Sequence, residues 1–176
     1  SVGLEVFDVE TLPTHGGSLR VFAAHKSART VSALVARMRE NEREFGLEKP
    51  ETYTAFQHQI ERLRDDFLGF LLAAKASGKS VAAYGAAAKG NTLLNFAGVR
   101  ADLISYVVDA APSKQGKFLP GSHIPIHAPS YLQDHRPDIL IILPWNIASE
   151  IATQNQELRA LGTRLVRVLP EIQDVY

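Results

Sequence analysis

The feature that most constrains the fold of this chain is a repeated order of strand, loop and helix that begins after Gly78. Such a repeat predicts a parallel sheet whose strands are joined by crossover helices. Five short apolar runs are typical of buried strands: Ser80–Tyr84, Leu103–Val108, Ile124–His127, Asp138–Leu143 and Arg164–Leu169. The stretches expected to be helical between them are Asn91–Phe96, Pro129–Asp134 and Asn146–Leu161. We therefore predict that residues 79–176 form an α/β domain, a Rossmann-like, mostly parallel five-stranded sheet flanked by helices.

Residues 1–26 have the pattern of a β-hairpin. Leu4–Glu10 alternates apolar and acidic residues, and Ser18–Ala24 is a second run of strand-forming residues. Because a lone hairpin is only marginally stable in water, we expect these two strands to complete a sheet formed by residues upstream. The chain also opens without an initiator methionine. We therefore expect it to be a piece of a longer polypeptide.

Residues 27–78 have helical periodicity. In Thr30–Phe45 the apolar residues recur at helical spacing until Gly46, and a second helix is expected from Pro50 to Gly78. The apolar spacing in both helices suits pairing of one with the other. We interpret this region as a helical hairpin that links two domains. A homodimer contact through residues 52–74 is the alternative.

Charge and cysteine content exclude several classes of function. The 19 basic and 19 acidic side chains cancel, so no overall field attracts the chain to nucleic acid or to an anionic membrane. The absence of cysteine excludes disulfides, thiolate metal sites and cysteine nucleophiles. The longest apolar runs, such as Ile139–Leu143, are far shorter than the ~20 residues of a membrane-spanning helix. We expect a cytoplasmic protein that binds neither nucleic acid nor membranes.

A glycine-containing loop follows the first predicted strand of the sheet. Gly85 ends that strand and Gly90 is expected to open the next helix, so that backbone N–H groups can approach a phosphate. The alanines between them, beginning with Ala86, keep the loop small. The residues that add a charge and hydrogen-bonding groups are Lys89, Asn91 and Thr92. We predict a phosphate-binding loop, with a tight turn that binds no ligand as the alternative.

This loop matches neither familiar phosphate-binding fingerprint. The dinucleotide pattern G-x-G-x-x-G requires glycine where Ala87 stands, and the P-loop pattern G-x-x-x-x-G-K-[ST] requires lysine where Asn91 stands. Both differences disfavour NAD and ATP as ligands. An NAD-binding oxidoreductase or a redox-sensing Rossmann domain is the alternative function.

Further polar residues follow strand ends, at the edge of the sheet where ligands bind in such folds. Asp109 stands where Rossmann folds place the carboxylate that bonds a ribose hydroxyl, or it caps the following turn. Lys114 and Lys117 follow in a loop that either covers a diphosphate or is simply solvated. Trp145, next to a helix-capping Asn146, suits stacking on a base or sugar, with simple packing as the alternative.

The histidines predict no metal site. His123 and His127 share one face of a predicted strand, but no third ligand is evident. His15 lies in a glycine loop of the N-terminal hairpin. It is either a site residue or a residue that structures the loop.

Five blocks of sequence extend in order over nearly the whole chain: Leu12–Ser18, Tyr84–Thr92, Lys114–Gly116, Pro120–Ile126 and Pro144–Asn146. Together they resemble the C-terminal domain of S-adenosylmethionine-dependent sugar C-methyltransferases. Those enzymes methylate a carbon beside the keto group of a nucleotide-linked deoxy-keto-sugar, in deoxysugar biosynthesis. The resemblance implies a nucleotide-linked sugar of dTDP type as ligand. It also implies S-adenosylmethionine as cofactor of the full-length enzyme, with no cofactor expected in this fragment.

The resemblance further implies how the full-length enzyme is divided. A zinc-binding domain and a methyl-donor domain lie upstream, and Leu4–Ala24 is the closing hairpin of the latter. The family's base, a histidine in a Tyr-x-Glu-His motif, also lies upstream, since no such motif occurs here. We therefore expect no catalytic residue in this chain, which we predict to be inactive alone. The residues expected to bind substrate are Gly85, Ala86, Lys89, Gly90, Asn91, Thr92, Asp109, Lys114, Trp145 and Asn146, with His15 as a further candidate.

Overall fold

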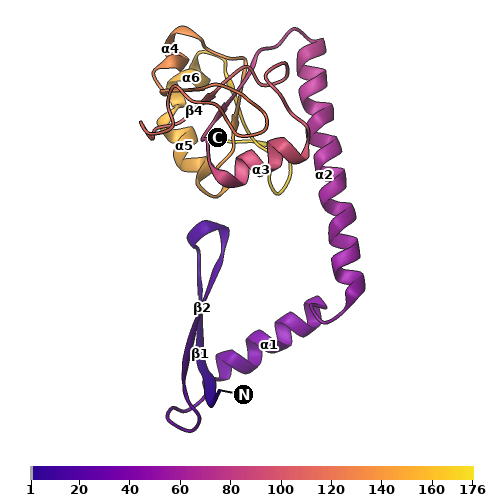
Figure 1. Ribbon diagram of the computed structural model, residues 1–176, viewed down its shortest axis with the longest axis vertical. Coiled ribbons are helices and arrows are strands. Elements are labelled where there is room, and N and C mark those ends of the chain that lie inside the picture. The colour runs from indigo at the N-terminus through magenta and orange to yellow at the C-terminus, as the bar shows by residue number, and fades with distance from the viewer. Residues whose placement is uncertain (1) are drawn as a thin grey trace. The chain divides into compact units, whose positions relative to one another are not determined.

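The computed structural model describes residues 2–176 (Figure 1). The chain divides into two compact units, of which the first ends at Gln59 and the second begins at Ile60. This division falls inside helix α2 (Pro50–Ala76). The predicted assignment of residues 1–26, 27–78 and 79–176 to separate domains stays a prediction.

The first unit begins with the predicted β-hairpin. Strands β1 (Leu4–Leu12) and β2 (Ser18–His25) pair antiparallel, and a 3₁₀ turn, η1 (Thr14–Gly16), lies between them. Helix α1 (Ala33–Phe45) packs beside β1. The hairpin is confirmed, and both strands are longer than predicted.

Helices α1 and α2 lie where the sequence predicted them. The Ser32 hydroxyl accepts a hydrogen bond from the N–H of Leu34 at 3.2 Å and so caps α1, which ends at Gly46 with a φ of 86°. Phe45 and Tyr53 are 72% and 56% exposed. These apolar side chains therefore do not pair α1 with α2 within the first unit, contrary to the expectation from their spacing.

The structure describes every residue of the second unit. Its sheet has six strands, in the order β5-β4-β3-β6-β7-β8. Five are parallel, as predicted, and β8 pairs antiparallel with β7. The strands are β3 (Val81–Tyr84), β4 (Val107–Val108), β5 (Ile126–His127), β6 (Ile139–Ile142), β7 (Arg164–Arg167) and β8 (Gln173–Asp174). The Rossmann-like fold is confirmed, but β8 was not predicted. Strand β4 is shorter than predicted because the N–H groups of Leu103 and Ile104 both donate to Arg100 in a turn.

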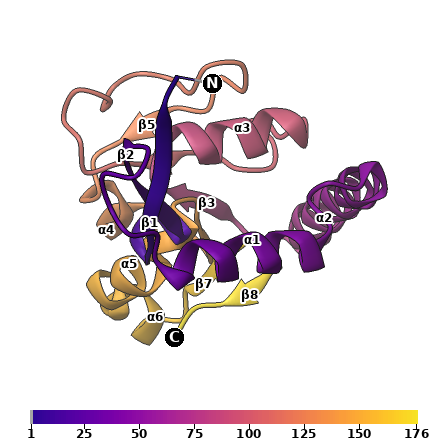
Figure 2. The same ribbon diagram turned by 90° about the horizontal axis from the view of Figure 1, so that it is seen from below.

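Helices cover both faces of this sheet (Figure 2). On one face, α3 (Ala88–Phe96) and the C-terminal part of α2 bury Leu94 and Phe67. The helices on the other face are α4 (Tyr131–Asp134), α5 (Ala148–Gln154) and α6 (Gln156–Ala160). Among the helices of residues 2–176, none combines the length and the apolar character needed to cross a membrane.

The prediction of one helix from Asn146 to Leu161 is wrong. A 3₁₀ turn, η2 (Trp145–Ile147), comes first, and the remainder is split into α5 and α6. The interruption falls at Asn155, whose Nδ2 donates to the carbonyl oxygen of Ile151 at 2.7 Å. An asparagine side chain that bonds the backbone in this way competes with the hydrogen bonds of a continuous helix.

Candidate ligand-binding site

Gly85 shapes the turn between β3 and α3. Its φ is 94°, and a Cβ atom here would lie 2.5 Å from Cγ of Pro144. Its N–H donates to the carbonyl oxygen of Val108 at 2.7 Å. Gly85 is therefore required by the turn and by the close approach of Pro144, while its N–H group serves the sheet.

Gly90 has a packing role. Helix α3 begins at Ala88, so Gly90 lies inside the first turn and does not open the helix as predicted. A Cβ atom at Gly90 would lie 2.6 Å from Cβ of Leu143. The missing side chain lets α3 pack closely on the end of β6, which is the role of the third glycine in dinucleotide-binding folds.

The start of α3 offers backbone N–H groups to a ligand. The first N–H groups of any helix have no acceptor inside it, and Ala87 at the N-cap has no side chain that could serve as one. The aligned peptide dipoles add a partial positive charge at this end. The hydroxyl of Thr92 is already engaged, because it donates to the carbonyl oxygen of Ala88 at 3.1 Å. The helix start therefore favours an anion through its backbone.

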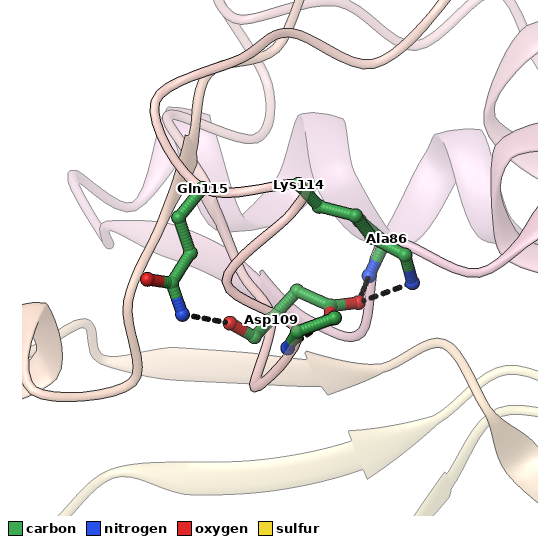
Figure 3. Close-up of polar contacts among 5 residues, drawn as sticks. Ala86, Asp109, Lys114 and Gln115 are labelled. Atoms are coloured by element: carbon green, nitrogen blue, oxygen red, sulfur yellow. Dashed lines mark hydrogen bonds and ion pairs between the residues drawn. The ribbon is translucent and has the colours of Figure 1, made fainter.

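Asp109 ties three segments together at the carboxyl edge of the sheet (Figure 3). Its Oδ2 accepts from the N–H of Ala86 at 2.7 Å and from Nζ of Lys114 at 3.0 Å. Its Oδ1 accepts from the N–H of Ala111 at 2.8 Å, and Gln115 donates to its backbone carbonyl at 2.9 Å. The side chain is only 10% exposed. Asp109 thus caps the following turn, the alternative left open by the sequence, while its predicted bond to a ribose stays a prediction.

The electrostatics agree with an ionised Asp109. Burial alone would raise the pKa of this carboxyl, but the hydrogen bonds from Ala111, Lys114 and Ala86 outweigh burial and lower it below its ordinary value. Burial raises the pKa of the neighbouring Tyr84, and the negative charge of Asp109 raises it further. The edge of the sheet therefore holds a fixed, internally neutralised negative charge.

A pocket of about 400 Å³ lies beside Asp109, between the start of α3 and the loop that follows β4. Its lining residues are Ala86, Ala87, Ala88, Asn91, Ser113, Lys114, Lys117, Phe118, Leu119, Pro120 and Ile126. The charged members of this set, Lys114 and Lys117, are both positive, and most of the others are apolar. The Oδ1 atom of Asn91 is buried and has no hydrogen-bond partner in the structure. The pocket suits an anionic ligand that also carries an apolar part.

Other hollows are weaker candidates. One of about 440 Å³ lies along α5 and α6 beside Tyr176, away from the strand ends, and its charged residues, Glu157 and Arg159, are of opposite sign. Throughout residues 2–176, no three side chains of His, Asp or Glu are grouped to hold a metal ion.

Several predicted residues lie outside the pocket. Nζ of Lys89 is 5.3 Å from the centre of the Trp145 ring, so these two meet at the same edge of the sheet. Asn146 is exposed, and its predicted capping role is wrong because α5 begins only at Ala148 with no side-chain cap. His15 lies in η1 of the first unit with a φ of 56°. Of the predicted residues, Ala86, Asn91 and Lys114 line the pocket, and Asp109 is bonded to Ala86 and Lys114.

Phe118, Ser113 and Gln115 were not predicted as site residues. Phe118 lines the pocket, and Gln115 holds the backbone of Asp109. An aromatic residue in a loop otherwise rich in lysine, glycine and proline is a signal that could have identified Phe118.

Comparison with known proteins gives a consistent result. The family described as "C-methyltransferase C-terminal domain" matches residues 13–170. The C-methyltransferase NovU of Streptomyces niveus is 41% identical over 172 residues, which are 97% of this chain and 41% of that protein. A crystal structure of UDP-D-quinovosamine 4-dehydrogenase from Vibrio fischeri has 16% identity and a TM-score of 0.42, covering 56% of this chain and 93% of that one.

Proposed function

The chain belongs to the family of C-methyltransferase C-terminal domains, and from that premise we propose that its second unit binds the nucleotide-linked sugar that the full-length enzyme methylates. The observation that carries the proposal is the pocket between α3 and the loop after β4, which is lined by Lys114 and Lys117 and by the residues that begin α3. Lysines and helix N-termini are the groups that proteins use to bind phosphates.

The charge of the pocket argues for a diphosphate and against the methyl donor. S-adenosylmethionine carries a positive sulfonium, but the lining of the pocket, within residues 2–176, contains no carboxylate; the neighbouring Asp109 is already paired with Lys114, and Lys117 is positive. These residues do not fit that cofactor. We propose that S-adenosylmethionine binds in another part of the full-length protein. The match to this chain covers only 41% of the C-methyltransferase relative, so that relative has room for such a site.

The contribution of this unit to the reaction is to hold the substrate. Methylation of a carbon beside a keto group requires a base to remove a proton and a methyl donor aligned with that carbon. Fixing one reactant in the correct position supplies much of the rate in such a reaction. We propose that the base and the donor come from the part of the enzyme outside this chain, and that the chain alone is inactive.

Calorimetry with the 176-residue chain tests the proposal. We expect saturable binding of dTDP and of a dTDP-sugar, and Lys117→Ala should weaken dTDP about tenfold because a charged contact to phosphate is lost. Lys89→Ala should weaken it less, because Lys89 does not line the pocket. Lys79→Ala is the matched control, since it removes the same charge from the opposite edge of the sheet, before β3, and should leave dTDP affinity unchanged.

An NAD titration of the same protein distinguishes the proposed function from the alternative, an NAD-binding domain. Saturable NAD binding by a folded chain that ignores dTDP would favour a dinucleotide-binding domain. If a folded chain binds neither dTDP nor NAD, the proposal that this unit binds a nucleotide-linked sugar is wrong.

A further inference from the structure

Phe118 is an exposed aromatic residue on a loop whose backbone is hydrogen-bonded on both sides of it. Its side chain is 61% exposed and lines the pocket. Both neighbouring residues are bonded across the loop: the N–H of Ile126 donates to Lys117 at 2.8 Å, and the N–H of Leu119 donates to Ile124 at 2.9 Å. An aromatic ring placed at the mouth of a pocket on a braced loop has no role in the core, but it offers a flat face to a ligand.

Asn91 points to a hydrogen-bond donor on that ligand. Its Oδ1 is buried at the pocket without a partner, and such an oxygen is an acceptor that water or a ligand must satisfy. A fully ionised diphosphate has only acceptor oxygens and cannot donate to Oδ1. A nucleobase can, through an N–H group on its edge, and so can a hydroxyl of the ribose or the sugar. The orphaned oxygen therefore fits the base end of a nucleotide better than the phosphates that the sequence analysis assigned to Asn91.

We propose that Phe118 and Asn91 form the base-binding end of the pocket, with Phe118 stacked on the nucleobase and Asn91 Oδ1 accepting from a base N–H. The phosphates then lie toward Lys114 and Lys117. The apolar lining supports this arrangement, since Leu119, Pro120 and Ile126 suit a flat ring and not a bare diphosphate. This inference rests on the proposed function. It assigns to Phe118 and Asn91 the preference of the pocket for a nucleoside diphosphate over a diphosphate without a base.

Isothermal titration of the 176-residue chain with dTDP and with inorganic pyrophosphate tests this assignment. Wild-type protein should bind dTDP far more tightly than pyrophosphate. Phe118→Ala should lower dTDP affinity about 5- to 150-fold, the range of one lost stacking contact, and leave pyrophosphate affinity unchanged. Asn91→Ala should lower dTDP affinity about 2- to 10-fold, again without effect on pyrophosphate.

Control variants keep the two proposals distinguishable. Phe96→Ala removes another exposed phenylalanine, at the far end of α3, and should change neither affinity. Lys117→Ala should weaken both ligands. Equal affinities of the wild-type chain for dTDP and pyrophosphate, or unchanged dTDP affinity in Phe118→Ala, would overturn the base assignment and leave the phosphate site standing. A folded chain that binds neither ligand would overturn both, and Phe118→Leu replaces Phe118→Ala if circular dichroism shows that the alanine variant is unfolded.

Discussion

The two edges of the second unit's sheet are each braced by an aspartate, but the two braces differ. At the carboxyl edge, Asp109 uses both side-chain oxygens and connects the β3–α3 turn with the loop that lines the pocket. At the amino edge, the single oxygen Oδ2 of Asp138 accepts from the N–H and the hydroxyl of Ser80, at 2.8 and 2.7 Å. The hydrogen bonds of Asp138 join the starts of two strands. Those of Asp109 also position Ala86 and Lys114, which lie outside the strands and line the pocket.

The glycines at the two edges repeat the difference. Gly85, at the carboxyl edge, has a φ of 94° and Pro144 against the place of its missing side chain. Gly78, at the amino edge, has a φ of 68° but nothing within 4 Å of that place. Of these two glycines, the crowded one lies beside the proposed ligand site, so Gly78 serves as the control for Gly85 and Asp138 as the control for Asp109.

The largest expected effect is that of Gly85→Ala. The new Cβ meets Pro144 in a backbone conformation that disfavours side chains, so we expect a loss of about 3 kcal/mol in the free energy of unfolding. Gly78→Ala carries only the backbone cost and should lose about 1 kcal/mol. Urea denaturation measures both. Equal losses would show that the carboxyl edge is no more tightly packed than the amino edge.

Asp109→Asn should have the next largest effect. An amide has only one acceptor oxygen, so its NH₂ group would face one of the donors that now bond to Asp109. We expect the free energy of unfolding to fall by about 2 kcal/mol. The amide oxygen of Asp138→Asn can still accept both bonds from Ser80, and its loss should be clearly smaller. Thermal unfolding compares the two variants. Binding of dTDP should also weaken in Asp109→Asn and not in Asp138→Asn.

The smallest effect concerns acid stability. Hydrogen bonds from Ser80 lower the pKa of Asp138, and the pKa of Asp109 is lowered despite its burial. A lowered pKa in the folded state means that the stabilisation is complete above the unfolded value of about 3.9 and is lost as pH falls through the folded value. The free energy of unfolding of Asp109→Asn should therefore fall less steeply below about pH 4 than that of the wild type. Identical slopes would indicate that the pKa of Asp109 is not lowered in the folded protein.

The parallel sheet could be predicted because it depends on local pattern. Runs such as Ile139–Leu143 are apolar throughout, which is typical of strands buried on both faces, and Gly85 follows the first strand as the turn requires. The break at Asn155 was missed because the apolar spacing continues through it, and only a hydrogen bond of its side chain interrupts the helix. Strand β8 has two residues, too few to give an alternating pattern.

The site was predicted in part for a similar reason. The position of Asp109 at a strand end can be derived from the sequence, and so can its local partners in the following loop, but its bond to the N–H of Ala86 in the β3–α3 turn exists only in the folded chain. The packing role of Gly90 depends on Leu143, which is distant in sequence. Sequence motifs indicate where a candidate ligand site lies, whereas the role of each residue in it depends on tertiary contacts.

The strand order also has a consequence for synthesis of the chain. Strand β3 pairs on one side with β4 and on the other with β6, which is translated much later. On the ribosome, the backbone N–H and C=O groups along one edge of the apolar strand β3 therefore stay unpaired until Ile139–Ile142 have emerged, and open edges of this kind invite aggregation. A nascent chain stalled before β6 should depend on chaperones more than one stalled after it.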